Sequence, residues 1–226
     1  MIARDHYQRA FEAYVRQRRL PYVSVDEARR AILPDAGPLR MAHLPGAGTN
    51  TLKSFDFVVY GSGSNLLVEV KGRKVARRRP VAEPARRASE RLLPLTPPPR
   101  VRLESWVTQD DVDSLKVWED LFGPGFLGVF VFVYWCDQLP PSALFEEFVE
   151  LDARWYAIRC VTRAAYQSAM RVRSPRWRTV PLPPEAFDRL SGPLTGIQTM
   201  SNHNPITDHS TPRAGPSLVP GAPGGR

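Results

Sequence analysis

Two carboxylates and a lysine interrupt the most regular apolar stretch of the sequence, residues 53–71 (KSFDFVVYGSGSNLLVEVK). The pattern predicts a β-hairpin with a Gly/Ser turn, in which Asp56, Glu69 and Lys71 stand where a buried strand usually carries Val or Ile. Side chains alternate between the two faces of a strand, so Glu69 and Lys71 share one face. The hairpin therefore gathers polar groups that could carry out chemistry on a charged substrate.

The length of the turn decides whether the two carboxylates meet. With a four-residue turn over 61–64, Asp56 faces Glu69, and directly opposed Cβ atoms lie about 4.5–5.5 Å apart. Like charges at that distance destabilise a sheet unless a cation lies between them, and Mg²⁺ or Mn²⁺ prefers carboxylate and carbonyl oxygens. A five-residue turn would set Asp56 opposite Val70 instead. The alternative is an ordinary solvated face that carries these polar residues.

A strongly basic segment begins at the end of the hairpin. Residues 71–102 contain eleven Lys or Arg and two Glu, a net charge of +9 against +8 for the whole chain. The prolines of this segment predict an irregular insertion over about 72–104, since Pro fits neither a helix interior nor a central strand. Such a concentration of charge indicates a polyanionic partner, nucleic acid before a membrane surface, and the alternative is a solvated loop. The residues expected to contact nucleic acid are Lys53, Arg73, Lys74, Arg77, Arg78 and Arg79.

Apolar periodicity predicts the elements that position the hairpin. Ahead of it we expect a helix over 4–19, a short strand over 23–25 and a helical turn to 31; behind it, a helix from Thr108 to about 122, a strand over 126–135, a strand over 155–161 and a helix over 162–170. Thr108 is a typical N-cap, and the run FLGVFVFVYW over 126–135 is typical of a central strand buried on both faces.

This order predicts a mixed α/β sheet flanked by helices. The predicted domain covers 1–190, and the Pro- and Gly-rich segment 191–226 is expected to be a disordered tail because it has little to bury.

The hairpin and its neighbours resemble the PD-(D/E)XK nuclease superfamily, above all its restriction-endonuclease-like and Holliday-junction-resolvase-like members. The resemblance covers about residues 6–135: a helix with Glu12, a hairpin with Asp56 and the triplet Glu69-Val70-Lys71, then a helix and an apolar strand. It implies an α-β-β-β-α-β core, although Ser54-Phe55-Asp56 replaces the Pro-Asp of the superfamily's name. The N-terminal HYQRAFE, residues 6–12, is similar to an uncharacterised bacterial family with an HYExAFE signature, from which Gln8 departs.

The resemblance implies a metal-dependent endonuclease that hydrolyses phosphodiester bonds, in DNA before RNA. Asp56, Glu69 and the Val70 carbonyl would hold Mg²⁺ or Mn²⁺, and Lys71 would orient or deprotonate the water and stabilise the phosphate. Glu12 would bind a second metal or orient Lys71; the alternative for Glu12 is an ion pair with Arg16 one turn later. Two other functions remain open: an inactive member of the fold that binds nucleic acid or a protein through the insertion, and a small structural or regulatory protein.

Other features favour structural roles. Asp110, Asp111 and Asp113 open a predicted helix, where acidic residues interact favourably with the helix dipole. The five tryptophans, Trp177 among them, are expected to pack in the core and on the sheet and not to stack on bases. Cys136 and Cys160 stand in apolar surroundings and are expected to be buried thiols.

The sequence also favours one compartment. It contains no run of 18 apolar residues, so no membrane span is expected, and the segment MIARDHYQRAFE lacks the apolar region of a secretory signal. The cytoplasm is therefore the expected compartment. Whether the protein acts alone or as a homodimer is left open by the sequence.

Overall fold

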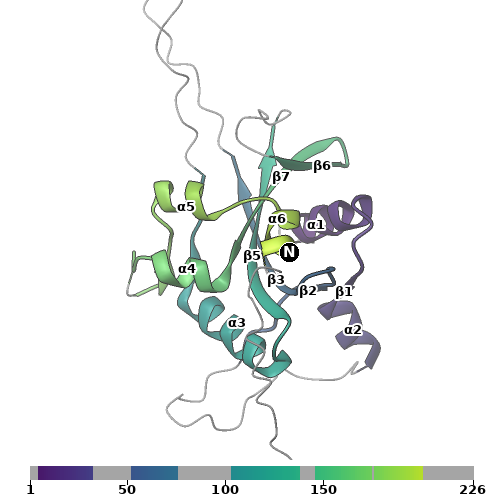
Figure 1. The fold of residues 1–226 in the computed structure, drawn as a ribbon. Helices are drawn as coiled ribbons and strands as arrows, with labels where there is room; N and C mark the ends of the chain where they lie inside the picture. The colour runs from purple at the N-terminus through teal and green to yellow at the C-terminus, as the bar shows by residue number, and fades with distance from the viewer. Residues whose placement is uncertain (1–4, 33–51, 76–102, 138–145, 175, 201–226) are drawn as a thin grey trace, which may run out of the picture.

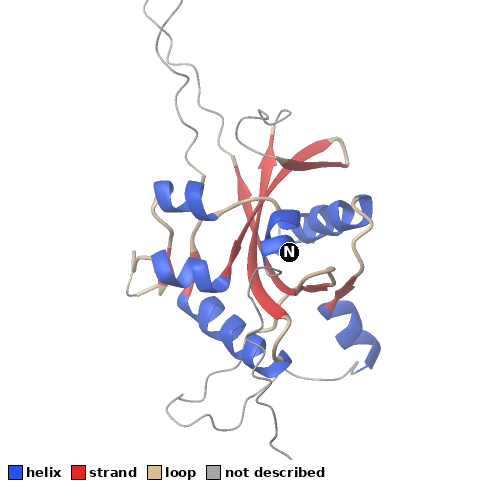
Figure 2. Cartoon of the chain, in the orientation of Figure 1, coloured by secondary structure: helices blue, strands red, loops and turns tan. Residues whose placement is uncertain are grey.

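A mixed β-sheet with helices on both faces forms the centre of the protein (Figures 1 and 2). The computed structural model describes residues 5–32, 52–75, 103–137, 146–174 and 176–200. The sheet contains β1 (Tyr22–Ser24), β2 (Phe57–Val59), β3 (Asn65–Lys74), β5 (Phe126–Cys136), β7 (Arg154–Thr162) and β6 (Glu147–Leu151), in this spatial order. Only β3 and β5 pair in parallel; the other neighbours are antiparallel. The predicted mixed α/β class is confirmed.

Two groups of helices cover the two faces of the sheet, as Figure 1 shows. One face packs against α1 (Asp5–Gln17) and α6 (Leu194–Met200). The other packs against α3 (Gln109–Phe122), α4 (Arg163–Ala169) and α5 (Pro184–Leu190). A small second sheet pairs β4 (Val107–Thr108) with β8 (Thr179–Val180), and α2 (Val25–Ile32) follows β1 directly. Each face thus has its own apolar core.

Strand β5 is the centre of the fold, as its apolar sequence predicts. It pairs with β3 on one side and with β7 on the other. Val129, Val131 and Val133 belong to the core under α1, and Phe130 and Phe132 belong to the core under α3 and α4. All five are fully buried, because helices cover both faces at this point.

Helix α3 begins at a capping box. The Thr108 hydroxyl accepts a hydrogen bond from the Asp111 backbone N–H, at 3.2 Å, and the Asp111 carboxylate accepts one from the Thr108 N–H, at 2.9 Å. These bonds satisfy backbone donors that have no partner inside the helix. The helix ends at Gly123, whose φ of 79° favours glycine. Both predicted ends of this helix are confirmed.

The predicted core order is present, with additions. Helix α1, strands β1, β2 and β3, helix α3 and strand β5 follow one another, with β4 inserted and with α2 at the place of the predicted helical turn. The sequence did not predict β4, β6, β8, α5 or α6, which are short. The predicted tail begins too early: α6 extends to Met200, and Leu194 and Ile197 pack in the core under α1. The segments 76–102 and 201–226 lie outside the described residues.

Two smaller expectations also have outcomes. Cys136 and Cys160 are buried free thiols, as predicted. Among the described residues, no helix is both long and apolar enough to span a bilayer.

Candidate active site

The hairpin has the register that a four-residue turn predicts. Phe57 pairs with Val68 and Val59 with Leu66, so Asp56 is in the position that faces Glu69. The regular ladder ends at Phe57, and the Asp56 backbone N–H donates to the Val68 carbonyl, at 2.8 Å. Asp56 is therefore the residue at which the chain enters the sheet, and its backbone is held there.

The Asp56 side chain continues the pairing beyond the end of β2. Its Oδ2 accepts a hydrogen bond from the Val70 backbone N–H, at 2.7 Å. Past this bond, β3 runs on to Lys74, and no strand of the described residues pairs with it on that side. The sheet edge is open there, between α1 on one face and α3 on the other.

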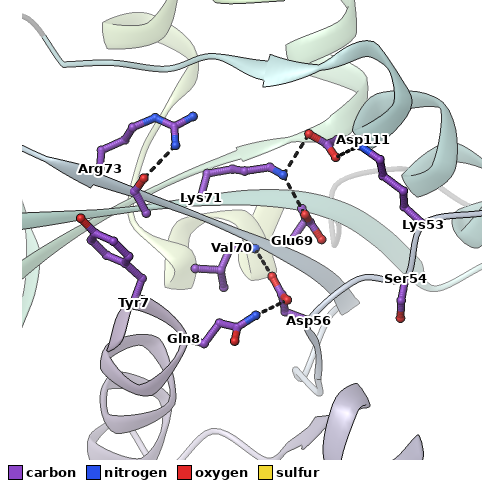
Figure 3. A pocket seen from close by; sticks show the side chains of 11 residues that line it. Tyr7, Gln8, Lys53, Ser54, Asp56, Glu69, Val70, Lys71, Arg73 and Asp111 are labelled. Carbon is purple, nitrogen blue, oxygen red and sulfur yellow. Dashed lines mark hydrogen bonds and ion pairs between the residues drawn. The ribbon is translucent and has the colours of Figure 1, made fainter. Parts of the chain in front are cut away.

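A pocket of about 560 Å³ lies at this open edge, and Figure 3 shows its side chains. Its walls come from α1, from the segment that leads into β2, from β3 and from the first turn of α3. The lining residues are Tyr7, Gln8, Lys53, Ser54, Asp56, Glu69, Val70, Lys71, Gly72, Arg73 and Asp111. The three predicted hairpin residues, Asp56, Glu69 and Lys71, thus share one cavity.

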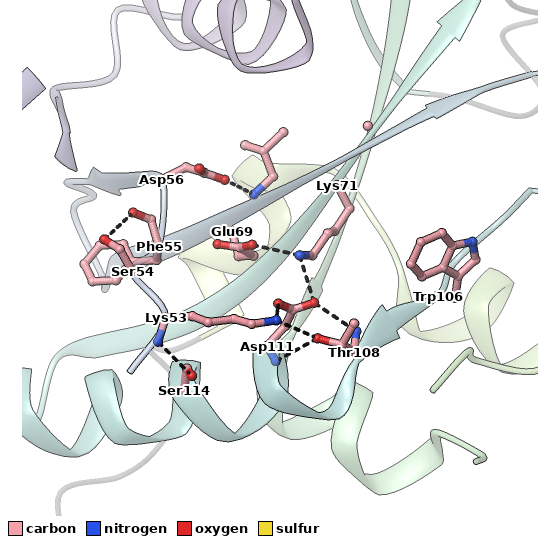
Figure 4. A network of polar contacts seen from close by, with 12 residues as sticks. Lys53, Ser54, Phe55, Asp56, Glu69, Lys71, Trp106, Thr108, Asp111 and Ser114 are labelled. Atoms are coloured by element: carbon pink, nitrogen blue, oxygen red, sulfur yellow. Dashed lines mark hydrogen bonds and ion pairs between the residues drawn. The ribbon is translucent and has the colours of Figure 1, made fainter. Parts of the chain in front are cut away.

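Lys71 lies between two carboxylates. Its Nζ is 2.7 Å from Glu69 Oε1 and 2.9 Å from Asp111 Oδ2 (Figures 3 and 4). Lys53 Nζ contacts the other Asp111 oxygen, at 3.0 Å. The Asp111 side chain is only 7% exposed and that of Lys71 14%, so these ion pairs are poorly screened by water. The result is a chain of alternating charges from Glu69 to Lys53.

Burial and neighbouring charges set the pKa values of this chain. Burial and, after it, the charge of Asp56 raise the pKa of Glu69 to about 7, although the charge and the hydrogen bond of Lys71 oppose them. Burial also raises the pKa of Asp56, although the Val70 N–H and the charge of Lys71 oppose it. For Lys71, burial lowers the pKa, but Glu69 and Asp111 outweigh it, so the pKa rises and the amine stays charged.

Asp111 behaves in the opposite way. Burial would raise the pKa of its carboxyl, but Lys71, the Thr108 N–H and Lys53 lower it to about 2. Asp111 is therefore the permanently ionised member of the group, and Glu69 is the member that changes protonation near neutral pH.

The donor chemistry of the pocket suits a hard divalent cation. Asp56 and Glu69 offer carboxylate oxygens next to the backbone of Val70, and the pKa of Glu69 is raised by burial and by repulsion from Asp56, which a cation would relieve. Both Asp56 oxygens accept hydrogen bonds, and Lys71 holds one Glu69 oxygen, but each carboxylate oxygen has a second lone pair. In the part of the chain that the structure describes, no group of three His, Cys, Asp or Glu side chains is arranged to hold a metal. The ligands expected from the sequence, Asp56, Glu69 and the Val70 carbonyl, include two carboxylates.

Helix α1 contributes Gln8 and Tyr7 to the pocket, and not Glu12. Gln8 Nε2 donates to Asp56 Oδ1 at 2.5 Å. The Tyr7 ring packs against Gly72, where a Cβ atom would lie 2.1 Å from the ring. Glu12 is one turn further along the helix and accepts hydrogen bonds from Arg16, at 2.6 Å, and from the Tyr22 hydroxyl, at 2.7 Å.

The expectation that Glu12 reaches the metal or Lys71 is therefore corrected. The ion pair with Arg16, which is the alternative that the sequence offers, is the one present. Asp111 holds Lys71 in the way that was expected of Glu12.

The predicted basic residues differ in their surroundings. Lys53 and Arg73 line the pocket, and Arg73 packs its guanidinium 4.0 Å from the Trp106 ring centroid. Lys74 is half-exposed, 4.2 Å from the centroid of the Trp135 ring. Arg77, Arg78 and Arg79 lie outside the described residues. Lys53 and Arg73 are therefore placed where a phosphate in the pocket could reach them.

Sequence reasoning missed Asp111 as a member of the site. Its place in a capping box explains its helical position, but a cap does not require a second carboxylate oxygen directed at Lys71. One signal was available: the face of β3 that carries Glu69 and Lys71 is also the face of Leu67, which packs in the core under α3. Glu69 and Lys71 lie at the end of that face, which α3 covers, so the buried charge of Lys71 could be expected to pair with an acidic residue in the first turn of α3.

Comparison with known proteins gives one distant likeness. The structure is similar to that of Hjc, a Holliday junction resolvase from Archaeoglobus fulgidus, solved at 1.6 Å resolution, with a TM-score of 0.41 and 12% identity. The match covers 85% of this chain and 98% of that chain. No protein-family model and no curated protein matches the sequence, so the similarity to the HYExAFE family stays a prediction. At this level of similarity, the structural match assigns neither an activity nor a role to any residue.

Proposed function

We propose that this protein is a metal-dependent endonuclease that hydrolyses phosphodiester bonds in DNA, with Mg²⁺ or Mn²⁺ as its cofactor. The observation that carries the proposal is the convergence of Asp56, Glu69 and Lys71 in one pocket at an open sheet edge. Carboxylates that hold a hard cation, beside a lysine that stays protonated, form a site suited to phosphate chemistry.

The charges of the pocket support a dependence on metal. Its lining has three carboxylates, Asp56, Glu69 and Asp111, and three cations, Lys53, Lys71 and Arg73. When all three carboxylates are ionised, these charges balance, and the lining by itself then has no excess positive charge for a phosphodiester. A divalent cation held by Asp56, Glu69 and the Val70 carbonyl would supply that excess and lower the pKa of a bound water.

The residues of the chain have separate parts in this proposal. Lys71, whose raised pKa keeps it charged, donates to a phosphate oxygen and stabilises the charge that grows there; it does not act as the base. Asp111 positions Lys71 from the first turn of α3, and Gln8 positions Asp56 from α1. Arg73 and Lys53, which line the pocket, are proposed to contact the neighbouring phosphates, and Arg77, Arg78 and Arg79 are proposed to add affinity without sequence recognition.

A second candidate is a protein of the same fold that binds nucleic acid without cleaving it. The hydrogen bonds already made by both oxygens of Asp56 favour this alternative, because metal ligation has to share those oxygens. The two functions differ in the effect of a metal: only the enzyme converts its DNA to shorter products.

The test is a cleavage assay with end-labelled branched, single-stranded and linear duplex DNA, each with Mg²⁺, Mn²⁺ or EDTA. We expect metal-dependent products from at least one DNA form and none in EDTA. Binding of DNA without products in any metal would support the inactive alternative. Neither binding nor products would remove both candidates.

A further inference from the structure

A hairpin rich in arginine follows α4, and its second arm includes β8. We call residues 171–174 and 176–181 the basic hairpin. Its two arms are joined by hydrogen bonds from the Arg171 N–H to the Pro181 carbonyl and from the Arg173 N–H to the Thr179 carbonyl, both at 3.0 Å. The chain places four arginines and one tryptophan here, Arg171, Arg173, Arg176, Trp177 and Arg178, and no Asp or Glu.

Trp177 is 68% exposed, one of the most exposed large apolar side chains of the described residues. The expectation that it packs in the core or on the sheet is therefore wrong. Its nearest charged companion is Arg176, whose guanidinium lies 5.4 Å from the ring centroid. An exposed indole beside a cation is a surface that a flat aromatic ligand can cover.

Three of the four arginines are available to a ligand. Arg178 is held by Asp110, at 2.6 Å, and by Asp113, at 3.7 Å. Arg171, Arg173 and Arg176 are exposed, and none of the carboxylates in the described ranges forms an ion pair with them. The hairpin therefore presents uncompensated positive charge in the segment that precedes Trp177.

The basic hairpin is fixed to the helix turn that serves the pocket. Besides the ion pair of Arg178 with Asp110, the Gln109 N–H donates to the Arg178 carbonyl, at 2.8 Å. The next residue, Asp111, holds Lys71 in the pocket. One helix turn thus connects the exposed hairpin with the proposed catalytic lysine.

A second cavity lies between the pocket and the basic hairpin. It has a volume of about 230 Å³, and its walls include Trp106 and Arg173. Trp106 is also the ring on which Arg73 of the pocket stacks, at 4.0 Å, and its carbonyl accepts a hydrogen bond from Arg73. Trp106 therefore contacts Arg73 of the pocket and shares the second cavity with Arg173, and Glu104 is the carboxylate that lines this cavity.

We propose that the basic hairpin binds an unpaired nucleic-acid strand, with one base stacked on Trp177 and phosphates held by Arg171, Arg173 and Arg176. The proposal rests on the proposed function only in that the same strand continues past Trp106 to the pocket. An indole face can stack only on a base whose own face is uncovered, so a single strand fits and an intact duplex does not. An acidic protein segment would satisfy the arginines but would leave the indole without a flat partner.

The test measures binding of a fluorescein-labelled 20-nucleotide single strand and of a blunt duplex of the same length, by anisotropy in EDTA. Trp177→Ala should weaken single-strand binding roughly five- to hundredfold and change duplex binding by less than about twofold, whereas Trp177→Phe should keep most of the affinity. Arg171, Arg173 and Arg176 changed together to Gln should flatten the salt dependence of single-strand binding by up to about two units of log affinity per log salt.

Two controls make the result specific. Val172→Ala removes the other exposed apolar side chain of the hairpin, and Arg18, Lys116 and Arg189 changed together to Gln remove three exposed cations of other elements. The thermal unfolding midpoint of every variant should match that of the wild type, because the altered side chains are exposed.

Three results would overturn the proposal: a wild type that binds no single strand, equal effects of Trp177→Ala on single strand and duplex, or an unchanged affinity in Trp177→Ala. Because these measurements are made without metal, they separate this site from the proposed activity. Single-strand binding that depends on Trp177, without any cleavage, would support the proposed role of the basic hairpin and contradict the proposed endonuclease activity. Cleavage by the wild type, together with single-strand binding that Trp177→Ala leaves unchanged, would support the activity and contradict the role of the hairpin.

Discussion

Lys71 Nζ lies 2.9 Å from Asp111 Oδ2, so the end of a strand and the first turn of a helix meet at one buried ion pair. The same carboxylate closes the capping box of α3 through the Thr108 N–H. A single side chain therefore fixes the helix against the sheet and sets the position of the proposed catalytic lysine.

Asp111→Asn tests this double role. The Asn oxygen can still accept from the Thr108 N–H, so α3 should stay capped, but Lys71 loses a charged partner. We expect the free energy of unfolding to fall by roughly 1–3 kcal/mol and the turnover number to fall more than the Michaelis constant changes. Asp113→Asn is the matched control, because Asp113 is in the same helix turn and exposed, and it should leave both quantities within about 0.5 kcal/mol. Equal effects at the two positions would show that the ion pair with Lys71 has no special part.

Asp56 offers a comparison of two substitutions. Asp56→Asn keeps an acceptor for the Val70 N–H, and Gln8 can turn its amide to accept from the new NH₂ group. The substitution also removes a buried carboxylate, and the raised pKa of Asp56 shows that burial disfavours its charged form. We therefore expect the free energy of unfolding in EDTA to be equal to or higher than that of the wild type, while cleavage is lost. Asp56→Ala leaves the Val70 N–H without this acceptor and should cost about 1–3 kcal/mol. Urea unfolding in EDTA measures both; loss of folding in Asp56→Asn would assign the carboxylate a structural role.

The pKa of Glu69 predicts a stability that depends on pH. Its value in the folded protein is about 7, against an ordinary value of 4.5, so between these limits the folded state binds more protons than the unfolded state. Stability should therefore fall as pH rises from about 4.5 to about 7, by at most about 1.4 kcal/mol per pH unit from this group.

Glu69→Gln should remove the part of the pH dependence of stability that comes from Glu69. The free energy of unfolding of the wild type and of the variant is measured in urea with EDTA at several pH values from 5 to 8. The difference between the two separates the contribution of Glu69 from that of Asp56. Glu185→Gln, at an exposed position of α5, is the control for the loss of a carboxylate elsewhere. A difference for Glu69→Gln that is the same at every pH would contradict the raised pKa of Glu69.

Gly72 is expected to tolerate no side chain. A Cβ atom there would lie 2.1 Å from the ring of Tyr7, so Gly72→Ala must displace a ring that lines the pocket. We expect a loss of about 1–3 kcal/mol, and part of it should be recovered when Tyr7→Ala is combined with it, because the two residues are in contact. Gly192→Ala, where no atom lies within 4 Å of the added Cβ, is the control. Additive effects of the two changes would place the cost of Gly72→Ala elsewhere.

Local patterns in the sequence were sufficient for most of the fold. The apolar run of β5, the cap at Thr108 and the Gly/Ser turn of the hairpin each depend on near neighbours in the chain, and each is present as predicted. The predicted end of the domain was wrong because this helix of seven residues has few apolar side chains, of which Leu194 and Ile197 pack in the core. Their burial depends on the core under α1, which a local pattern does not reveal.

The candidate site was predictable where it depends on one hairpin and not where it depends on packing. The pairing of Asp56 with Glu69 follows from the length of the turn. Which residue of α1 reaches the pocket depends on the position of that helix along the sheet. The sequence alone therefore could not decide whether Gln8 or Glu12 contacts the pocket. The same holds for Asp111, whose contact with Lys71 requires the crossing of α3 over β3.

The most direct test of the central claim is single-turnover cleavage of the preferred DNA with Mg²⁺, compared among the wild type, Asp56→Asn, Glu69→Gln and Lys71→Met. Asp120→Asn is the matched control, because its exposed carboxylate pairs only with Lys116 among the described residues. We predict that the three pocket variants lose at least about a hundredfold in rate while they remain folded, and that Asp120→Asn keeps the wild-type rate. Metal-dependent cleavage that persists unchanged in Asp56→Asn and Glu69→Gln, or a folded wild type that cleaves no DNA in either metal, would contradict the claim.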